Sequence, residues 1–114
     1  MRLFRVLLYS DDPQFCMKMV AECERLGFQI RLVDYLEEIK EQYEIVAVDV
    51  GSDFKKTRYI SKAKETFRVP IFAITNKMNS KLQAKCNDDG ASLTFEKKIF
   101  IQSLHSIKSH VENA

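Results

Sequence analysis

The chain has 114 residues, a formal net charge of +2, 46% hydrophobic residues and 30% charged residues. This length and composition are typical of one globular domain and exclude collagen, low-complexity and intrinsically disordered proteins. The longest apolar run, near residues 6–9, is far shorter than the roughly 20 residues of a membrane-spanning helix. Asp11 and Asp12 end that run before it reaches the length of a signal peptide. We therefore expect a single domain over residues 1–114, located in the cytoplasm.

Cysteine usage indicates neither a disulfide framework nor a zinc site. The three cysteines are odd in number, lack C-x-x-C spacing and have no histidine nearby: Cys16, Cys23 and Cys86. We expect them to be buried thiols.

Strand-like apolar runs alternate with segments of helical spacing along the whole chain. In chain order the predicted elements are strand 3–9, helix 13–26, strand 28–33, helix 35–42, strand 44–50, helix 55–67, strand 69–75, a helix from 78 to near 90, strand 91–95 and helix 99–111. The first helix has the clearest ends, with Asp12 as N-cap, Pro13 in its first position and Gly27 after its last turn. Asp34 and Glu37 are spaced as a capping box for the second.

Strict alternation of strand and helix predicts an α/β fold. Apolar strands such as residues 45–48 are typical of a parallel sheet whose two faces are both covered by helices. We therefore expect a doubly wound, five-stranded parallel sheet, in which right-handed crossovers allow few topologies.

Carboxylates follow two strands of this expected sheet. In an open doubly wound sheet, ligands bind beyond the carboxyl ends of the strands, and for the strand order 2-1-3-4-5 the site lies between strands one and three. Asp11 and Asp12 follow the first strand, and Asp49 ends the third. The three negative charges repel one another, and a bound cation would offset this repulsion. A cluster in which all ligands are oxygen atoms suits Mg²⁺. The sequence therefore predicts a magnesium site.

Two further strand ends carry groups that bind phosphoryl oxygens. The fourth strand ends at Thr75, which offers a hydroxyl donor, and the fifth is followed by Lys97, which offers an ammonium group. Three aspartates, one Mg²⁺ and Lys97 have a formal charge of zero together. A phosphoryl group fits this set, because one aspartate can attack phosphorus while the metal, Thr75 and Lys97 hold the oxygens.

Five separated segments resemble the receiver domain of two-component response regulators, and the resemblance spans essentially the whole chain. The segments are VLLYSDD at residues 6–12, IVAVD at 45–49, PIFAIT at 70–75, the Gly90–Ala91 pair, and Lys97. The interval from Thr75 to Lys97 is also similar to that of the family. The resemblance implies a flavodoxin-like receiver fold with strand order 2-1-3-4-5.

The resemblance also implies a role for each matching residue. Asp49 would be the phosphoacceptor. The ligands of Mg²⁺ would be Asp12 directly, Asp11 partly through water, Asp49, and the carbonyl of Gly51. Thr75 would bind a phosphoryl oxygen and Lys97 would bridge to Asp49 or to the phosphate, so that the chain is a signalling phosphoacceptor and not a turnover enzyme.

The partners implied by the resemblance are proteins. A sensor histidine kinase or phosphotransfer protein would donate the phosphoryl group, and a downstream protein would bind the face formed by the fourth helix, fifth strand and fifth helix. No membrane contact is expected, and no nucleic-acid contact without an attached output domain. A homodimer is left open, as is whether the chain stands alone or is a fragment of a longer regulator.

Several positions depart from the family pattern and indicate an atypical receiver. Lys98 stands where a proline usually follows the conserved lysine, and Thr94 occupies the aromatic switch position, with Phe95 on the opposite strand face. Asn76 replaces a small residue and could narrow access to the phosphoryl group. Residues 50–53 lack the usual Pro-Gly turn.

Two alternatives to the phosphoacceptor function stay open. The departures also suit a phosphorylation-independent pseudo-receiver that acts as a protein-interaction module, and a small flavodoxin-like ligand binder or hydrolase is a third candidate.

Taken singly, the site residues have simpler explanations, such as Asp12 serving only as an N-cap. Lys77, Lys81 and Lys85 recur every four residues and form either a docking face or a solvated helix face.

Overall fold

The structure is a computed structural model that describes residues 3–34 and 41–113. Its elements are, in chain order, β1 (Arg5–Tyr9), α1 (Pro13–Leu26), β2 (Gln29–Val33), β3 (Ile45–Gly51), the 3₁₀ helix η1 (Phe54–Thr57), α2 (Arg58–Thr66), β4 (Ile71–Thr75), α3 (Ser80–Asp88), β5 (Leu93–Glu96) and α4 (Lys97–Glu112). None of the helices in these ranges has both the length and the apolar character needed to cross a membrane.

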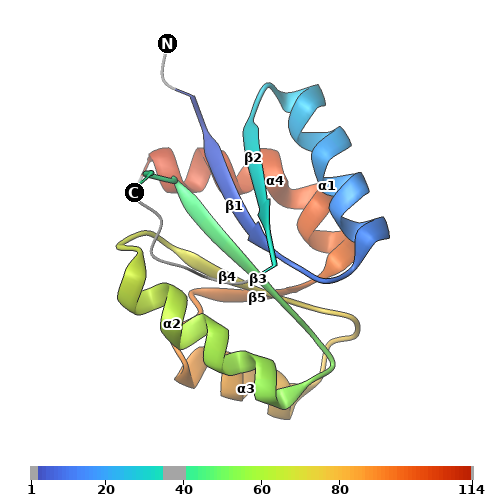
Figure 1. Ribbon diagram of the computed structural model, residues 1–114, viewed down its shortest axis with the longest axis vertical. Coiled ribbons are helices and arrows are strands. Elements are labelled where there is room, and N and C mark those ends of the chain that lie inside the picture. The colour runs from blue at the N-terminus through green and yellow to red at the C-terminus, as the bar shows by residue number, and fades with distance from the viewer. Residues whose placement is uncertain (1–2, 35–40, 114) are drawn as a thin grey trace.

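The five strands form one parallel sheet in the order β2-β1-β3-β4-β5 (Figure 1). This confirms the predicted flavodoxin-like α/β fold. The central strand β3 is buried along almost its whole length, as is β4, whereas the edge strand β2 is half exposed. Continuous apolar sequence therefore marks the strands that are covered on both faces.

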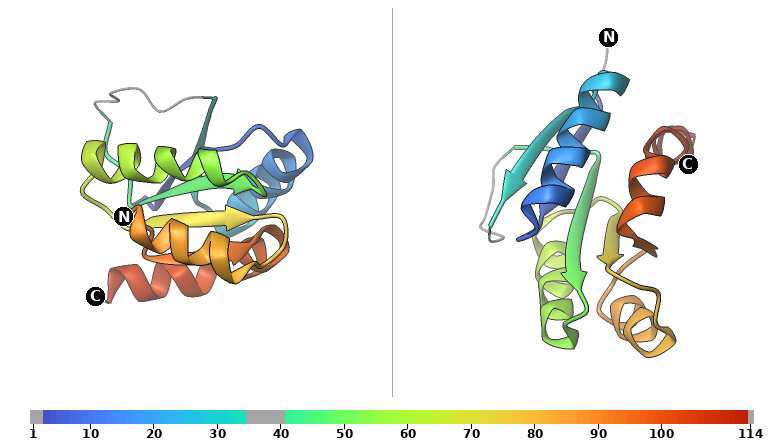
Figure 2. Two further views of the ribbon diagram at one scale, coloured as in Figure 1. Left: turned by 90° about the horizontal axis from the view of Figure 1, so that it is seen from below. Right: turned by 90° about the vertical axis from the view of Figure 1, so that its right-hand side faces the viewer.

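Helices cover both faces of the sheet (Figures 1 and 2). On one face, α1 and α4 pack against side chains that include Val6 and Leu8 of β1. On the other, α2 and α3 pack against the alternate side chains of the same strand, Leu7 and Tyr9. Because successive side chains point to opposite faces, each central strand contributes to two apolar cores. All five strands end at the same edge of the sheet.

Two of the predicted helices differ from the observed ones in their first turns. The predicted helix 55–67 is a 3₁₀ turn followed by α2, because the Asp53 side chain caps the turn at the Lys55 N–H. Helix α3 begins at Ser80, capped by Asn79, so Lys77 lies in the preceding loop and not on one helix face with Lys81 and Lys85.

Two further predictions concern helix ends and the second helix. Helix α4 begins at Lys97, two residues earlier than predicted. Most of the predicted helix 35–42, with Glu37 of its capping box, lies outside the described residues, and residues 41 and 42 are not helical.

Candidate functional site

The candidate site lies at the carboxyl ends of β1 and β3, the neighbouring strands at the centre of the sheet. The end of β3, the loop after β1, η1 and the first residue of α4 bring six of the site's polar residues to this edge: Ser10, Asp11, Asp12, Asp49, Lys56 and Lys97. Parallel strands of a doubly wound sheet place ligand-binding groups at this edge.

Asp49 is the buried centre of the site, with only 1% of its surface exposed. Its Oδ2 accepts a 2.7 Å hydrogen bond from the Ser10 hydroxyl, and its Oδ1 accepts a 2.9 Å hydrogen bond from the Gly51 N–H. The Lys97 Nζ lies 3.4 Å from Oδ2. A buried carboxylate needs such partners, because burying an unpaired charge costs several kcal/mol or more.

Lys97 joins two of the aspartates. Its Nζ donates a 2.8 Å hydrogen bond to Oδ2 of Asp12 and also contacts Asp49, so both carboxylates face one ammonium group. Hydrogen bonds lower the pKa of Asp12. The largest effect comes from Lys97 and a smaller one from the backbone N–H of Phe15. Burial alone would lower the pKa of Lys97, but the hydrogen bond to Asp12 and the charge of Asp49 outweigh it and raise that pKa.

Asp12 also has a structural role. Its Oδ1 accepts hydrogen bonds from the N–H groups of Gln14 and Phe15, which makes it the N-cap of α1. The simple N-cap explanation and the site explanation are thus both satisfied, because the cap uses one carboxylate oxygen and Lys97 uses the other.

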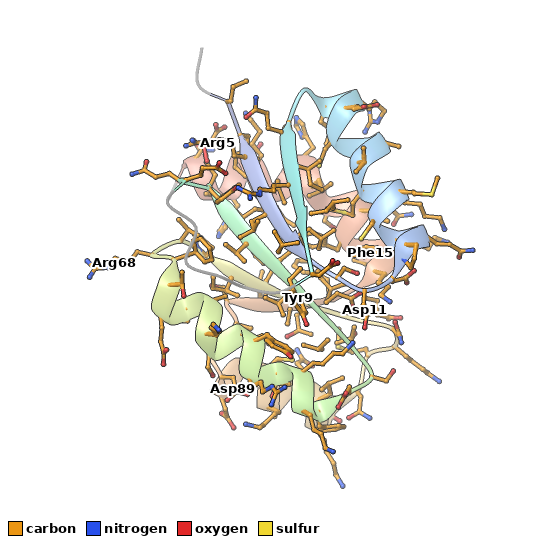
Figure 3. All side chains as sticks on the ribbon, viewed as in Figure 1. Arg5, Tyr9, Asp11, Phe15, Arg68 and Asp89 are labelled. Atoms are coloured by element: carbon orange, nitrogen blue, oxygen red, sulfur yellow. The ribbon has the colours of Figure 1, made fainter. Side chains whose placement is uncertain are left out.

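Asp11 pairs with a different lysine. It lies past the carboxyl end of β1 (Figure 3), where its Oδ2 accepts a 2.5 Å hydrogen bond from Lys56 Nζ of η1. This bond is the main cause that lowers the pKa of Asp11 and raises the pKa of Lys56. Asp11 is therefore held as a carboxylate and Lys56 as an ammonium group.

Two expected site residues make their closest polar contacts elsewhere. The Thr75 hydroxyl, buried at the end of β4, donates a long 3.5 Å hydrogen bond to the carbonyl of Phe95 in β5. The Gly51 carbonyl accepts a 3.0 Å hydrogen bond from the Asn76 N–H. Gly51 follows a register shift in β3 and has a φ of +59°, in the left-handed region that favours glycine.

Two residues of the site, Ser10 and Lys56, were not predicted from the sequence. Ser10 lies directly before Asp11 and Asp12, so the sequence could have placed it at this edge of the sheet. The hydrogen bond from its hydroxyl to Asp49 could not be predicted. Lys56 is 45 residues from Asp11 in the chain, and only the fold brings them together. Nothing in the sequence distinguishes Lys56 from the adjacent Lys55.

The donor chemistry of the site fits a hard divalent cation. The expected ligands are three carboxylates and one backbone carbonyl, and Mg²⁺ prefers such oxygen ligands. Within residues 3–34 and 41–113, however, no three acidic, histidine or cysteine side chains are gathered closely enough to form a metal site. Two ammonium groups balance the charge of the carboxylates instead, since Lys56 pairs with Asp11 while Lys97 contacts Asp12 and Asp49.

The residues that depart from the family pattern have clear places in the structure. Phe95 packs toward Phe72 and Phe100 on the α1–α4 face. Thr94 is buried, and its hydroxyl is the one buried side-chain oxygen or nitrogen in the described part of the chain that lacks a hydrogen-bond partner. Asn76 donates a 3.3 Å hydrogen bond from its side chain to Ser52.

Comparisons with solved structures give one consistent result. A response regulator from Thermotoga maritima superposes with a TM-score of 0.83 at 15% identity and covers 99% of this chain and 100% of its own. The receiver domain of a sensor histidine kinase from Pseudomonas aeruginosa, with magnesium ion coordinated in its active-site cleft, gives a TM-score of 0.74 at 22% identity, covering 99% and 100%.

A third solved structure carries the modification itself. A response regulator from Burkholderia pseudomallei, with a phosphorylated aspartic acid, calcium ion and citrate, gives a TM-score of 0.77 at 17% identity and covers 97% of this chain and 73% of its own. No protein-family model and no curated protein matches the chain. The topology and these similarities together lead to one conclusion: the chain has the CheY-like fold of response regulator receiver domains.

Proposed function

We propose that the chain is a phosphoacceptor receiver domain that takes a phosphoryl group onto Asp49. The observation that carries this proposal is the position of Lys97, whose ammonium group contacts both Asp12 and the buried Asp49. A cation shared by carboxylates from two neighbouring strands is the arrangement that a phosphoryl group would need for charge compensation. The receiver fold and the magnesium and phosphoaspartate in similar structures support the same function.

The proposed reaction is a single phosphoryl transfer. A carboxylate oxygen of Asp49 attacks phosphorus, the new phosphorus–oxygen bond forms, and the phosphorus–nitrogen bond to the donor phosphohistidine breaks. The leaving imidazole nitrogen keeps the bonding electrons and takes a proton. Autodephosphorylation reverses the modification with water, so the chain acts as a switch and not as a turnover enzyme.

The surrounding residues have distinct roles in this proposal. Lys97 stays beside Asp49 and binds a phosphoryl oxygen, and Thr75 turns its hydroxyl from the Phe95 carbonyl toward the modified Asp49. Asp11, Asp12, Asp49 and the Gly51 carbonyl would hold Mg²⁺. When bound, this ion supplies positive charge next to the phosphoryl oxygens.

The proposed partners are a histidine kinase or phosphotransfer protein in the cytoplasm and a downstream protein. The face formed by α3, β5 and α4 is the candidate surface for the downstream protein. It carries two exposed apolar side chains, Leu93 and Ile99, and the exposed side chain of Lys81. Exposed apolar groups among cations suit a protein partner with a complementary acidic surface.

An intact-mass measurement tests the phosphoacceptor function. The protein is incubated with Mg²⁺ and a small acyl phosphate, and its mass is compared with that of the Asp49→Asn variant. We expect one phosphoryl group on the wild-type chain and none on the variant. No adduct on either chain, or an adduct that survives the substitution, would contradict the proposal.

A second candidate is a phosphorylation-independent pseudo-receiver. The observation that favours it is that Asp49 is almost fully buried and both of its oxygens already accept hydrogen bonds, from Ser10 and the Gly51 N–H. In that case the carboxylate would be a structural group, and partner binding would be unchanged by Asp49→Asn and by beryllofluoride. Loss of partner binding in either experiment would exclude this candidate.

A further inference from the structure

Lys56 is placed at the site by a well-defined turn. The Asp53 side chain accepts a hydrogen bond from the Lys55 N–H, and the Asp53 carbonyl accepts one from the Lys56 N–H. The Thr57 hydroxyl closes the same turn on the carbonyl of Phe54. This turn leaves Lys55 exposed and directs Lys56 toward the end of β1.

The ammonium group of Lys56 contacts one carboxylate of the candidate metal site. Its hydrogen-bond partner is Asp11, and the charge of Asp49 also acts on it. The Lys56 side chain is 26% exposed, whereas that of Asp11 is 73% exposed, so the lysine is the more enclosed partner. A mobile surface lysine would show the opposite distribution.

The charges of the site explain what Lys56 does there. The three aspartates carry a formal charge of −3, and the ammonium groups of Lys56 and Lys97 reduce it to −1 without a metal ion. A divalent cation beside Asp11 would therefore meet a positive charge that already neutralises this carboxylate. Two cations at one carboxylate repel each other, and this repulsion weakens the binding of the divalent cation.

We propose that Lys56 is a built-in competitor of the divalent cation: its ammonium group holds Asp11 in the resting protein and opposes the binding of a hard cation to that carboxylate. The proposal rests on the metal site of the proposed function and adds a residue that sets its affinity. Lys56 then raises the Mg²⁺ concentration at which the site fills, compared with a site that lacks the lysine.

A Mg²⁺ titration tests this competition directly. Backbone amide signals of Asp11, Asp12 and Gly51 are followed by ¹H–¹⁵N NMR while Mg²⁺ alone is added to the wild type, to Lys56→Gln and to the matched control Lys55→Gln. The control removes the same charge from the same turn. We expect Lys56→Gln to bind Mg²⁺ about tenfold more tightly and Lys55→Gln to bind like the wild type. Lys56→Met is the second substitution, because it keeps the length of the side chain without its charge.

The outcomes separate this proposal from the function on which it rests. Equal affinity in all three proteins, or an equal gain in both variants, would overturn the role of Lys56 and leave the metal site intact. No binding by any of them, including the two Lys56 variants, would overturn the metal site and this proposal together.

Discussion

The hydroxyl of Ser10 donates a 2.7 Å hydrogen bond to Oδ2 of Asp49, across two strands and 39 residues of sequence. The same hydroxyl accepts a 3.2 Å hydrogen bond from the N–H of Asp12. Ser10 therefore links the buried carboxylate of β3 to the loop that begins α1. It also occupies the oxygen of Asp49 that faces Lys97.

Replacing Ser10 with alanine should destabilise the protein. The substitution removes a donor from a buried carboxylate, and hydrogen bonds to charged groups contribute roughly 1.5–3 kcal/mol. We expect the free energy of unfolding to fall by about 2 kcal/mol, measured by urea denaturation.

A double-mutant cycle with Asp49→Asn shows whether this loss comes from the Ser10–Asp49 bond. In the Asp49→Asn background the charge is gone, so the further cost of Ser10→Ala should drop below about 1 kcal/mol. Additive costs would mean that Ser10 stabilises the protein through other contacts.

The two roles of Asp12 can be separated by two substitutions. Asparagine caps a helix about as well as aspartate but has no charge for Lys97, so Asp12→Asn should cost less than about 1 kcal/mol. Alanine removes the cap as well, and Asp12→Ala should cost about 1 kcal/mol more than Asp12→Asn. Urea denaturation of the three proteins measures both differences. Equal stability of the two variants would show that the cap contributes nothing.

Thr94→Val should stabilise the protein. The Thr94 hydroxyl lies near the thiol of Cys86, a weak partner, and no hydrogen bond of ordinary geometry satisfies it within the described residues. Valine has nearly the same shape and no polar group to bury, so the free energy of unfolding should rise by about 1 kcal/mol. Thr94→Ser keeps the hydroxyl and is the control. A loss of stability in Thr94→Val would mean that the hydroxyl has a partner in solution.

The stability of the protein should fall at alkaline pH because of Cys23. Burial raises the pKa of its thiol from 9.0 to about 11. The unfolded chain therefore releases this proton at lower pH than the folded chain, so stability is complete below pH 9 and is lost as pH rises toward 11. The full loss for this thiol, reached once the pH has risen past 11, is about 3 kcal/mol, since each of the two pKa units corresponds to about 1.4 kcal/mol.

Cys23→Ala provides the comparison for the alkaline transition. The variant has no thiol at this position, so its stability should decrease less steeply between pH 9 and pH 11 than that of the wild type. Urea denaturation at intervals across this range gives both slopes. Identical slopes would show that Cys23 does not titrate differently in the folded and unfolded chains.

Much of the fold could be predicted because local signals agree with the final structure. Asp12, Pro13 and Gly27 mark the two ends of α1 within one residue, as the cap hydrogen bonds and the left-handed φ of Gly27 confirm. The predicted strands match β1 to β5 because each apolar run has a length and composition that suit a buried parallel strand. The 3₁₀ turn before α2 was missed because it depends on the side-chain cap from Asp53.

The contacts within the site could be predicted only in part. The position of a residue at a strand end follows from topology, which places Asp49 and Lys97 at the same edge of the sheet. The choice of partner does not, because it depends on side-chain conformations and on competition among charges. Thr75 illustrates this point, since its hydroxyl is directed to the Phe95 carbonyl in β5.

Beryllofluoride binding, followed by ¹H–¹⁵N NMR in the presence of Mg²⁺, tests most directly whether Asp49 is a phosphoacceptor. Beryllofluoride mimics a phosphoryl group on a carboxylate. We predict saturable shifts of the amide signals of Gly51, Thr75 and Lys97 in the wild type and none in Asp49→Asn. An unchanged wild-type spectrum at saturating Mg²⁺ and beryllofluoride would contradict the phosphoacceptor function.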